Sequence, residues 1–334
     1  MSAKNKILIR VDGSNKIGLG HIVRTFALAQ ILNESYTIQF YCKEIPEKLE
    51  SEIVEKGFGV QKIFNEEQFF SQIQPNHIVV IDGYEFDSEY MKLLKGKGAK
   101  VVVIDDLCNM HYYADLIINH SPSANKDKYE ALPNTKFALG LDYALLREKF
   151  LLQATKHRTI KKVSNVIVCF GGADPQNYTY ATLKVLSQFK GFNKIVAIVG
   201  SGYTFGESLL ELADSDTRIQ VKQCLNEQEM IKEMLQAELA ITSASGIALE
   251  AICCGCIPLI GITAMNQENF HDAIVKRVSV RSFGNNMETF QSESLFEALK
   301  GVNPDFSTKM EVLRLKMARA PQNLVSIFTI LNNG

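Results

Sequence analysis

Short apolar runs alternate with longer amphipathic stretches along the whole chain. In the first half the apolar runs read KILIRV, YTIQFYC, HIVVIDG and KVVVIDD, and apolar residues at helical spacing lie between them near 19–33, 46–56 and 86–95. Strands joined by helices in this way form right-handed crossovers, and such crossovers build parallel sheets that are covered on both faces. The pattern therefore predicts an α/β fold.

The alternation lapses once, in the basic stretch LLQATKHRTIKKVS, and then restarts with VSNVIVCFGG. A chain of 334 residues suits two domains of about 150 residues each. We predict two doubly wound, Rossmann-like parallel-sheet domains that face a cleft. The expected N-terminal domain covers 1–153, the linker 154–163 and the C-terminal domain 164–334, and the last helix could pack back on the N-terminal domain.

Charge and hydropathy narrow the choice of partner. The 36 basic and 37 acidic residues give a net charge of -1, which provides no electrostatic reason to expect nucleic acid or an anionic membrane as partner. The sequence contains no apolar run long enough to span a membrane, and its first residues, MSAKNKILIRVDG, do not resemble a signal peptide. We expect a cytoplasmic protein that binds a small molecule and does not insert into a membrane; a monomer is favoured, and the sequence leaves the oligomeric state open.

Seven cysteines occur, several of them inside apolar runs, which is typical of reduced core residues. Cys253 and Cys256 form a CxxC pair, but no second pair completes a zinc site, and the pair lies where a helix ends rather than where one begins. We expect a structural role for these cysteines, with neither a metal nor a cofactor in the protein.

The first strand leads into a glycine turn that contains Asp12, Gly18, Gly20 and His21. This turn is not a GxGxxG motif, and no acidic residue closes the next strand, so the turn does not favour a nicotinamide or flavin enzyme. His21 is expected in the first turn of a helix, where partial positive charge on the backbone amides disfavours imidazolium. A neutral His21 could act as a general base; the alternative is a capping or packing histidine.

Two further apolar strands end in polar residues at the same predicted sheet edge. Asp82 and Tyr84 follow HIVVI, and Asp105 and Asp106 follow KVVVI. Ligands of doubly wound sheets bind beyond the carboxyl ends of the strands, so these side chains are candidates for the site. Asp106 could equally cap a helix or brace a loop.

The second half carries two turns suited to anions. Gly171 and Gly172 open CFGGADPQN, and glycines there allow the backbone to approach a ligand next to a helix N-terminus. Ser243, Ser245 and Gly246 form a second strand-to-helix turn that offers amides and hydroxyls to a phosphate. These turns predict a nucleotide-binding domain.

Glu250 follows the serine turn by one helical turn. Because a phosphate would repel this carboxylate, it is better suited to accept hydrogen bonds from ribose hydroxyls. Asn266 and Gln267 follow the next strand and complete a polar rim.

Together these turns resemble the GT-B architecture of nucleotide-sugar enzymes, and within it the UDP-sugar hydrolases of pseudaminic acid biosynthesis and their spore-coat polysaccharide relatives. The segments that carry the resemblance are Arg10, Asp12, Ile17-Gly18-x-Gly20-His21 with Arg24, Ile81-Asp82-x-Tyr84, Ile104-Asp105-Asp106-Leu107, Gly140-x-x-Tyr143-Ala144-Leu145-Leu146-Arg147, Gly171-Gly172-Ala173-Asp174-Pro175 and Asn266-Gln267.

The resemblance implies metal-independent hydrolysis of UDP-2,4-diacetamido-2,4,6-trideoxy-β-L-altropyranose to UDP and the free sugar, in pseudaminic acid or surface-glycan synthesis. It implies that His21 activates water at the anomeric carbon, that Tyr84 contacts sugar or water, and that UDP lies against the C-terminal domain. The implied substrate and UDP contacts are Asp12, Gly18, Gly20, Arg24, Gly171, Gly172, Ser245, Gly246, Glu250, Asn266 and Gln267.

Two other functions stay open at this point. A GT-B glycosyltransferase would pass the sugar from UDP to an acceptor other than water, and a non-catalytic protein would bind the nucleotide sugar without turnover. The sequence also leaves the identity of the hexose open.

Overall fold

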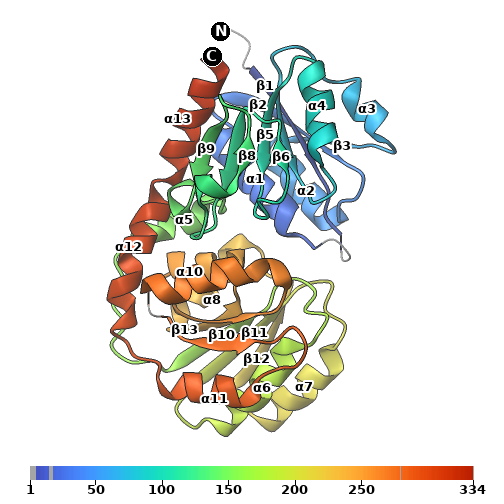
Figure 1. The fold of residues 1–334 in the computed structure, drawn as a ribbon. Coiled ribbons are helices and arrows are strands. Elements are labelled where there is room, and N and C mark those ends of the chain that lie inside the picture. The colour runs from blue at the N-terminus through green and yellow to red at the C-terminus, as the bar shows by residue number, and fades with distance from the viewer. Residues whose placement is uncertain (1–4, 15–17, 279, 334) are drawn as a thin grey trace. The chain divides into compact units, whose positions relative to one another are not determined.

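The computed structural model describes residues 5–14, 18–278 and 280–333, and it is built around two large sheets of parallel strands. Contacts divide the chain into two compact units (Figure 1). The first unit comprises Met1–Glu148 together with Arg319–Gly334, and the second comprises Lys149–Ala318. The predicted α/β class is confirmed, since each unit contains its own parallel sheet flanked by helices.

The sheet of the first unit has seven strands in the order β3-β2-β1-β4-β5-β7-β9, and every neighbouring pair is parallel. β6 and β8 form a separate parallel pair. The strands span β1 (Asn5–Val11), β2 (Tyr36–Cys42), β3 (Gly59–Lys62), β4 (Ile78–Asp82), β5 (Lys100–Ile104), β6 (His111–Tyr112), β7 (Leu116–Asn119), β8 (Glu130–Ala131) and β9 (Lys136–Leu139).

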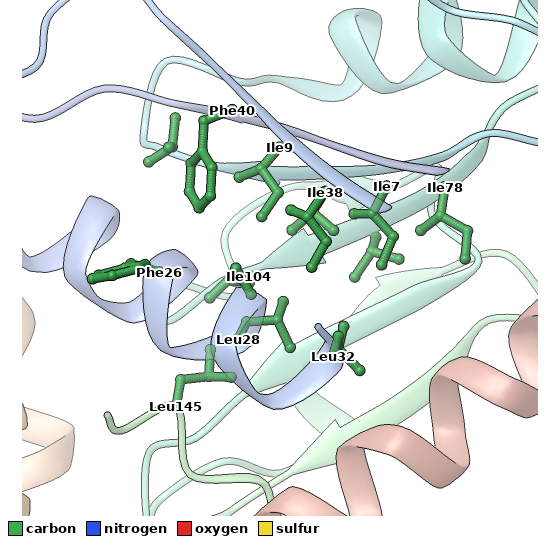
Figure 2. Close-up of a cluster of buried hydrophobic side chains, with 14 of the residues drawn as sticks. Ile7, Ile9, Phe26, Leu28, Leu32, Ile38, Phe40, Ile78, Ile104 and Leu145 are labelled. Carbon is green, nitrogen blue, oxygen red and sulfur yellow. The ribbon is translucent and has the colours of Figure 1, made fainter. Parts of the chain in front are cut away.

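Helices connect these strands and cover both faces of the sheet, which is why the central strands are apolar at consecutive positions. Ile7 and Ile9 of β1 belong to one buried cluster, shown in Figure 2, whereas Leu8 between them belongs to a second cluster on the opposite face. The helices of this unit are α1 (Gly20–Leu32), α2 (Glu47–Glu55), α3 (Glu66–Phe70), α4 (Ser88–Gly96), η1 (Lys126–Lys128), η2 (Leu141–Tyr143) and α13 (Ala320–Asn333).

The C-terminal helix α13 is part of the first unit. Leu324, Phe328 and Leu331 of this helix are buried in the same cluster as Ile7 and Phe26, and the rings of Phe328 and Tyr36 lie 6.2 Å apart. Apolar burial of this kind contributes roughly 1.5–3 kcal/mol for each large side chain, so α13 stabilises the first unit directly.

The second unit contains a six-stranded parallel sheet in the order β12-β11-β10-β13-β14-β15. Its strands are β10 (Asn165–Cys169), β11 (Lys194–Val199), β12 (Ile219–Gln223), β13 (Leu239–Ser243), β14 (Ile257–Ile262) and β15 (Ser282–Asn285). Its helices are α6 (Tyr178–Gln188), α7 (Gly206–Ser215), α8 (Glu227–Gln236), α9 (Gly246–Cys253), η3 (Met265–Gln267), α10 (Glu268–Val278), α11 (Ser292–Lys300) and α12 (Phe306–Ala318).

The contact division falls at residues 148/149 and 318/319, whereas the sequence pattern places the first boundary at a linker over 154–163. Helix α5 (Glu148–Ala154) accounts for the earlier position. Its residues Phe150, Leu151 and Ala154 are buried, and the carbonyl of Gln153 accepts a hydrogen bond of 2.9 Å from Arg314 of α12. The sequence pattern lapses only after α5 and so assigns this helix to the N-terminal domain, whereas its contacts with α12 group it with the second unit.

None of the helices in the described part of the chain combines the length and the apolar character needed to cross a membrane.

Candidate active site

The carboxyl ends of β1, β4, β5 and β7 lie side by side at one edge of the first sheet. Val11 is in register with Asp82 at the end of β4, and Ile104 of β5 is in register with Ile118 of β7. Asp106 and His120 lie two residues beyond Ile104 and Ile118, respectively. Since side chains alternate along a strand, this spacing directs both toward the face that α1 covers.

His21, in the first turn of α1, is joined to the end of β4 by a short hydrogen bond. Its Nδ1 atom lies 2.6 Å from Oδ1 of Asp82, and both side chains are buried, at 8% and 1% exposure. Arg24, one turn later on α1, donates from Nε to Oδ2 of Asp82 and from Nη2 to Oδ1, each over 2.6 Å. The structure thus brings together His21 and Arg24, two of the predicted site residues, through an aspartate at the predicted edge.

The contacts of Nδ1 determine the tautomer of His21. Two acceptors cannot share a distance of 2.6 Å, so Nδ1 carries a proton and donates it to Asp82. The nearby Nη2 of Arg24, 3.1 Å from Nδ1, is then a second donor and makes its hydrogen bond with the carboxylate instead. In the neutral ring Nε2 consequently keeps its lone pair and can accept a proton, which is the arrangement found in Asp-His pairs of hydrolases.

Arg24 lies between two carboxylates, because Nη1 also donates to Oδ2 of Asp106 over 3.0 Å. Burial opposes charge on this guanidinium, but Asp82 and Asp106 outweigh it and raise the pKa of Arg24 above its ordinary value. Burial likewise opposes ionisation of Asp82, and Arg24 with His21 nevertheless lowers the pKa of this carboxyl. Arg24 and Asp82 therefore form a charged pair that holds His21 in place, and the side chain of Arg24 is only 12% exposed to any substrate.

Tyr84 lies against the histidine. Its ring meets that of His21 edge to face, with centroids 4.7 Å apart, and its side chain is about half exposed. Such an edge contact fixes the orientation of the imidazole while leaving part of the phenol open to a ligand. The geometry is compatible with the predicted contact between Tyr84 and sugar or water.

His120 is a member of this cluster that sequence reasoning missed. Its Nδ1 accepts the backbone N–H of Leu145 over 3.1 Å, so its proton is on Nε2. Burial, followed by the positive charge of Arg24, lowers the pKa of His120 to about 4, and the ring is neutral at physiological pH. The available signal was its position directly after the apolar strand LIIN, at the same edge as Asp82.

Asp12 occupies a different environment from His21. One carboxylate oxygen accepts the backbone N–H groups of Lys43 and Glu44 over 2.5 and 3.0 Å, and the other pairs with Arg10 over 2.8 Å. Arg10 is fully buried and also binds Glu66 over 2.8 Å. These contacts brace the loop after β2, so the oxygens of Asp12 are committed to the protein rather than directed to a ligand.

Gly18 and Gly20 flank the start of α1. Gly18 has φ +90, a conformation that residues other than glycine rarely adopt, and its backbone N–H donates to the carbonyl oxygen of Ser14 over 2.7 Å. The helix N-cap, Leu19, provides no side-chain hydrogen bond to the first turn of α1. Ile17 of the motif, with Asn15 and Lys16, lies outside the described residues.

In the second unit Ser243, Ser245 and Gly246 lie where β13 passes into α9. The hydroxyls of Ser243 and Ser245 are 2.9 Å apart, and Ser245 is the N-cap of α9 without using its side chain as a cap. Glu250, one turn along α9, is only 7% exposed. The three residues lie at the strand-to-helix turn that the sequence pattern predicts, and anion binding there stays a prediction.

The glycine pair after β10 lets two loops approach closely. Gly171 has φ +95, and a Cβ on Gly200 would meet the carbonyl oxygen of Gly172 at 2.4 Å. Asp174 next to this pair accepts the backbone N–H groups of Tyr178 and Thr179, over 2.9 and 2.8 Å, at the start of α6. Independently of any ligand, the positive φ therefore favours glycine at 171, and the close approach of the Gly172 backbone requires glycine at 200.

Asn266 and Gln267 lie in the short helix η3 after β14. The side-chain oxygen of Gln267 accepts the backbone N–H of Thr263 over 2.8 Å, which closes the turn. The structure thus places Asn266 and Gln267 at the carboxyl end of β14, next in the sheet to β13.

Cys253 and Cys256 are fully buried, and burial raises the pKa of both thiols, to about 11 for Cys256. Cys256 donates to the carbonyl of Met234 over 3.0 Å. The burial of both thiols and the hydrogen bond from Cys256 are typical of cysteines in a protein core. Within residues 5–14, 18–278 and 280–333, no group of three or more His, Cys, Asp or Glu side chains is arranged to hold a metal ion.

Comparison with curated proteins finds relatives at modest identity, while no family model matches. The chain is 28% identical over 259 residues to the UDP-2,4-diacetamido-2,4,6-trideoxy-beta-L-altropyranose hydrolase of Campylobacter jejuni, covering 74% of this chain and 88% of that protein. It is 25% identical over 267 residues to the spore coat polysaccharide biosynthesis protein SpsG of Bacillus subtilis, covering 78% of each.

A third relative, an uncharacterized protein of Methanocaldococcus jannaschii, is 28% identical over 291 residues. The match covers 82% of this chain and 59% of that relative, so the chain spans less than two thirds of its length.

Solved structures share the fold. MurG of Acinetobacter baumannii superposes with a TM-score of 0.65 at 13% identity, over 98% of this chain and 99% of that one. The calicheamicin glycosyltransferase CalG4 superposes with a TM-score of 0.64 at 10% identity, over 100% and 99%. At these identities the likeness concerns the fold alone. The chain is thus related in sequence to a UDP-diacetamido-trideoxy-altropyranose hydrolase and a spore coat polysaccharide protein, and it has the GT-B fold of glycosyltransferases, as the resemblance predicted.

Proposed function

We propose that the protein hydrolyses a UDP-2,4-diacetamido-2,4,6-trideoxyhexose, most simply the β-L-altropyranose named for its Campylobacter relative, to UDP and the free sugar. The observation that carries the proposal is the hydrogen bond of 2.6 Å between His21 and Asp82, which fixes the tautomer with an unprotonated Nε2. We further propose that the reaction belongs to nonulosonic acid or surface-glycan synthesis in the cytoplasm; the name of the Bacillus relative, a spore coat polysaccharide biosynthesis protein, supports the surface-glycan assignment.

In the proposed reaction, His21 acts as the general base. Nε2 removes a proton from water as the water oxygen bonds to the anomeric carbon, and the bond from that carbon to the phosphate oxygen breaks with its electron pair leaving on UDP. The imidazolium formed is stabilised by Asp82, which remains ionised because Arg24 lowers its pKa. A single displacement of this kind inverts the anomeric centre.

UDP is a good leaving group, so the proposed reaction requires neither an acid to protonate it nor a metal. The negative charge that develops on the phosphate is stabilised by preorganised donors. We propose that the serine turn at Ser245 and Gly246 supplies these donors, with Gly171 and Gly172 beside the nucleotide. Glu250 is proposed to accept from the ribose, and Asn266 and Gln267 to contact the nucleotide sugar.

A glycosyltransferase is the second candidate, because the solved structures with this fold are glycosyltransferases. It would use the same base to activate an acceptor hydroxyl in place of water. The two reactions differ in where the sugar goes and in whether an acceptor accelerates UDP release.

The test is UDP release by the intact chain from UDP-2,4-diacetamido-2,4,6-trideoxyhexoses, run in heavy-oxygen water with and without excess EDTA. The proposal predicts release that EDTA does not slow and heavy oxygen at the anomeric position of the sugar, with none in UDP. Heavy oxygen in UDP would show cleavage of the phosphate bond and contradict the mechanism. Release that occurs only after a sugar acceptor is added would favour the transferase.

A further inference from the structure

The proposed reaction does not use His120, although this side chain belongs to the candidate active site. His120 directly follows β7 at the carboxyl edge of the first sheet, the edge at which β4 ends in Asp82. Leu145, which donates its backbone N–H to His120, belongs to the same buried cluster as Phe26 of α1 (Figure 2). The imidazole of His120 therefore lies beside α1, the helix that carries His21.

The tautomer of His120 is opposite to that of His21. Nδ1 of His120 accepts the backbone N–H of Leu145 over 3.1 Å, so its proton is on Nε2. This is the one hydrogen bond that the ring makes among the described residues. His21 has its proton on Nδ1, where it donates to Asp82, and its lone pair on Nε2. One histidine of the site can thus take a proton from a ligand, whereas the other offers a hydrogen bond to one.

His120 makes this offer as an uncharged group. Burial and the positive charge of Arg24 lower the pKa of His120 to about 4, so the ring is neutral at physiological pH. A neutral imidazole can donate a hydrogen bond to a substrate oxygen without placing a second cation beside Arg24. Such a donor suits a reaction in which the anomeric carbon becomes electron-poor as the leaving group departs, because imidazolium would repel the developing positive charge.

We propose that His120 binds the sugar directly, with Nε2–H donating a hydrogen bond to an acceptor oxygen of the sugar. The inference rests on the proposed function for the presence of a sugar at His21, and it adds a residue that selects and orients that sugar. In a 2,4-diacetamido-2,4,6-trideoxyhexose the oxygen is the hydroxyl at C3 or an acetamido carbonyl. Asp106 is the protein's own alternative acceptor, because its Oδ1 has no hydrogen-bond partner among the described residues.

Two substitutions separate the proposed donor from the bond to Leu145. In His120→Asn the side-chain oxygen can take the position of Nδ1 and accept from Leu145, while nothing replaces Nε2–H. In His120→Gln the terminal amide can reach the position of Nε2 and donate there, while the bond from Leu145 is lost. His77→Asn is the matched control: Nδ1 of His77 also accepts a backbone N–H, from Gln74 over 3.2 Å, but His77 precedes β4 and lies at the opposite edge of the sheet.

The experiment measures binding and turnover on the full-length chain. Calorimetry gives the dissociation constants of UDP and of the UDP-2,4-diacetamido-2,4,6-trideoxyhexose in protein carrying His21→Asn, so that no donor is consumed. Steady-state UDP release gives kcat and KM with His21 intact. Each measurement is repeated with His120→Asn, His120→Gln and His77→Asn.

We expect His120→Asn to weaken binding of the UDP-sugar roughly 2- to 10-fold and to raise KM by a similar factor, because the contact is made in the ground state and in the transition state alike. UDP affinity and kcat should stay within about twofold of their values with His120. His120→Gln should recover most of the loss, and His77→Asn should change none of these quantities.

A 3-deoxy analogue of the UDP-sugar identifies the oxygen. If the hydroxyl at C3 is the acceptor, His120→Asn no longer weakens binding of this analogue, because the partner of Nε2–H is already missing. If an acetamido carbonyl is the acceptor, the analogue is weakened by the same factor as the full donor.

The proposal is overturned if His120→Asn binds and turns over the UDP-sugar like the wild type, or if His120→Gln is the more impaired variant, since both results reduce the role of His120 to its bond with Leu145. It is also overturned if His120→Asn lowers kcat at unchanged KM and affinity, because His120 would then act on His21 through Asp106 and Arg24. A wild-type protein whose UDP-sugar affinity depends on His120 but that releases no UDP would refute the proposed hydrolysis and leave the sugar contact intact.

Discussion

Replacing Asp82 by asparagine should remove the base without changing the shape of the site. Asp82 binds Arg24 through both oxygens and His21 through Oδ1. The new amide has one oxygen, and the guanidinium of Arg24, which only donates, would hold it. The amide nitrogen would then face Nδ1 of His21 and donate to it. That contact forces the proton onto Nε2, so the ring could no longer accept a proton from water.

Loss of a positioned general base lowers the rate by roughly 10²- to 10⁴-fold, or about 3–5 kcal/mol in activation free energy. The variant also leaves Arg24 with one anionic partner, Asp106, instead of two. Breaking a buried ion pair costs roughly 3–5 kcal/mol in stability. Because Asp106 still pairs with Arg24 in the variant, we expect a loss near the lower end of this range. A chain of ordinary stability stays folded after such a loss.

The assay compares kcat for UDP release by wild type and Asp82→Asn, with thermal unfolding and UDP affinity measured on the same samples. We expect kcat to fall by at least 100-fold while UDP affinity stays within about twofold. Because the pKa of Asp82 is lowered in the folded protein, its ionised carboxylate stabilises the wild type above about pH 4, and this contribution is lost as the pH falls through the pKa of the folded state. The free energy of unfolding of Asp82→Asn should lack this dependence on pH. A variant with kcat within about threefold of wild type would refute the tautomer argument.

Three further predictions concern other parts of the chain. Burial lowers the pKa of His120 from 6.5 to about 4, so the unfolded state binds more protons than the folded state as the pH falls below 6.5. Between pH 7 and pH 5 the unfolding free energy of the wild type, measured in urea, should therefore fall by about 2 kcal/mol more than that of His120→Asn. Equal losses in the two proteins would contradict this prediction. Glu250→Gln should weaken UDP binding roughly 10- to 100-fold by calorimetry, and unchanged affinity would exclude the ribose contact. In native protein a thiol reagent should modify at most Cys108 and Cys224, the two cysteines that are not buried, and modification of a third before unfolding would contradict the burial of the core thiols.

Periodicity predicts most of the fold because it reports directly which faces are buried. The apolar run KILIRV is buried at consecutive positions, and the alternation of such runs with helices predicts both parallel sheets. The edge of the sheet at which His21 and Asp82 lie follows from the same rule about strand ends.

Side-chain partners are harder to predict from sequence. Nothing in the spacing of Arg24 shows that its guanidinium is enclosed by Asp82 and Asp106, and nothing around Asp12 shows that its oxygens bind the loop after β2. His120 lies in a segment with no glycine turn, so the pattern that singles out His21 does not reach it. The sequence allows the last helix to pack on the N-terminal domain, but the side chains that α13 buries against α1 depend on tertiary structure that local patterns do not encode.

The proposed hydrolysis depends on His21 as the general base. The most direct test of this role is the rate of UDP release by His21→Asn relative to the wild type. His157→Asn is the control, because the side chain of His157 is 78% exposed in the second unit. We predict a fall of roughly 10²- to 10⁴-fold for His21→Asn, with UDP binding retained, and no change for His157→Asn. Turnover by His21→Asn at the wild-type rate would contradict the central claim.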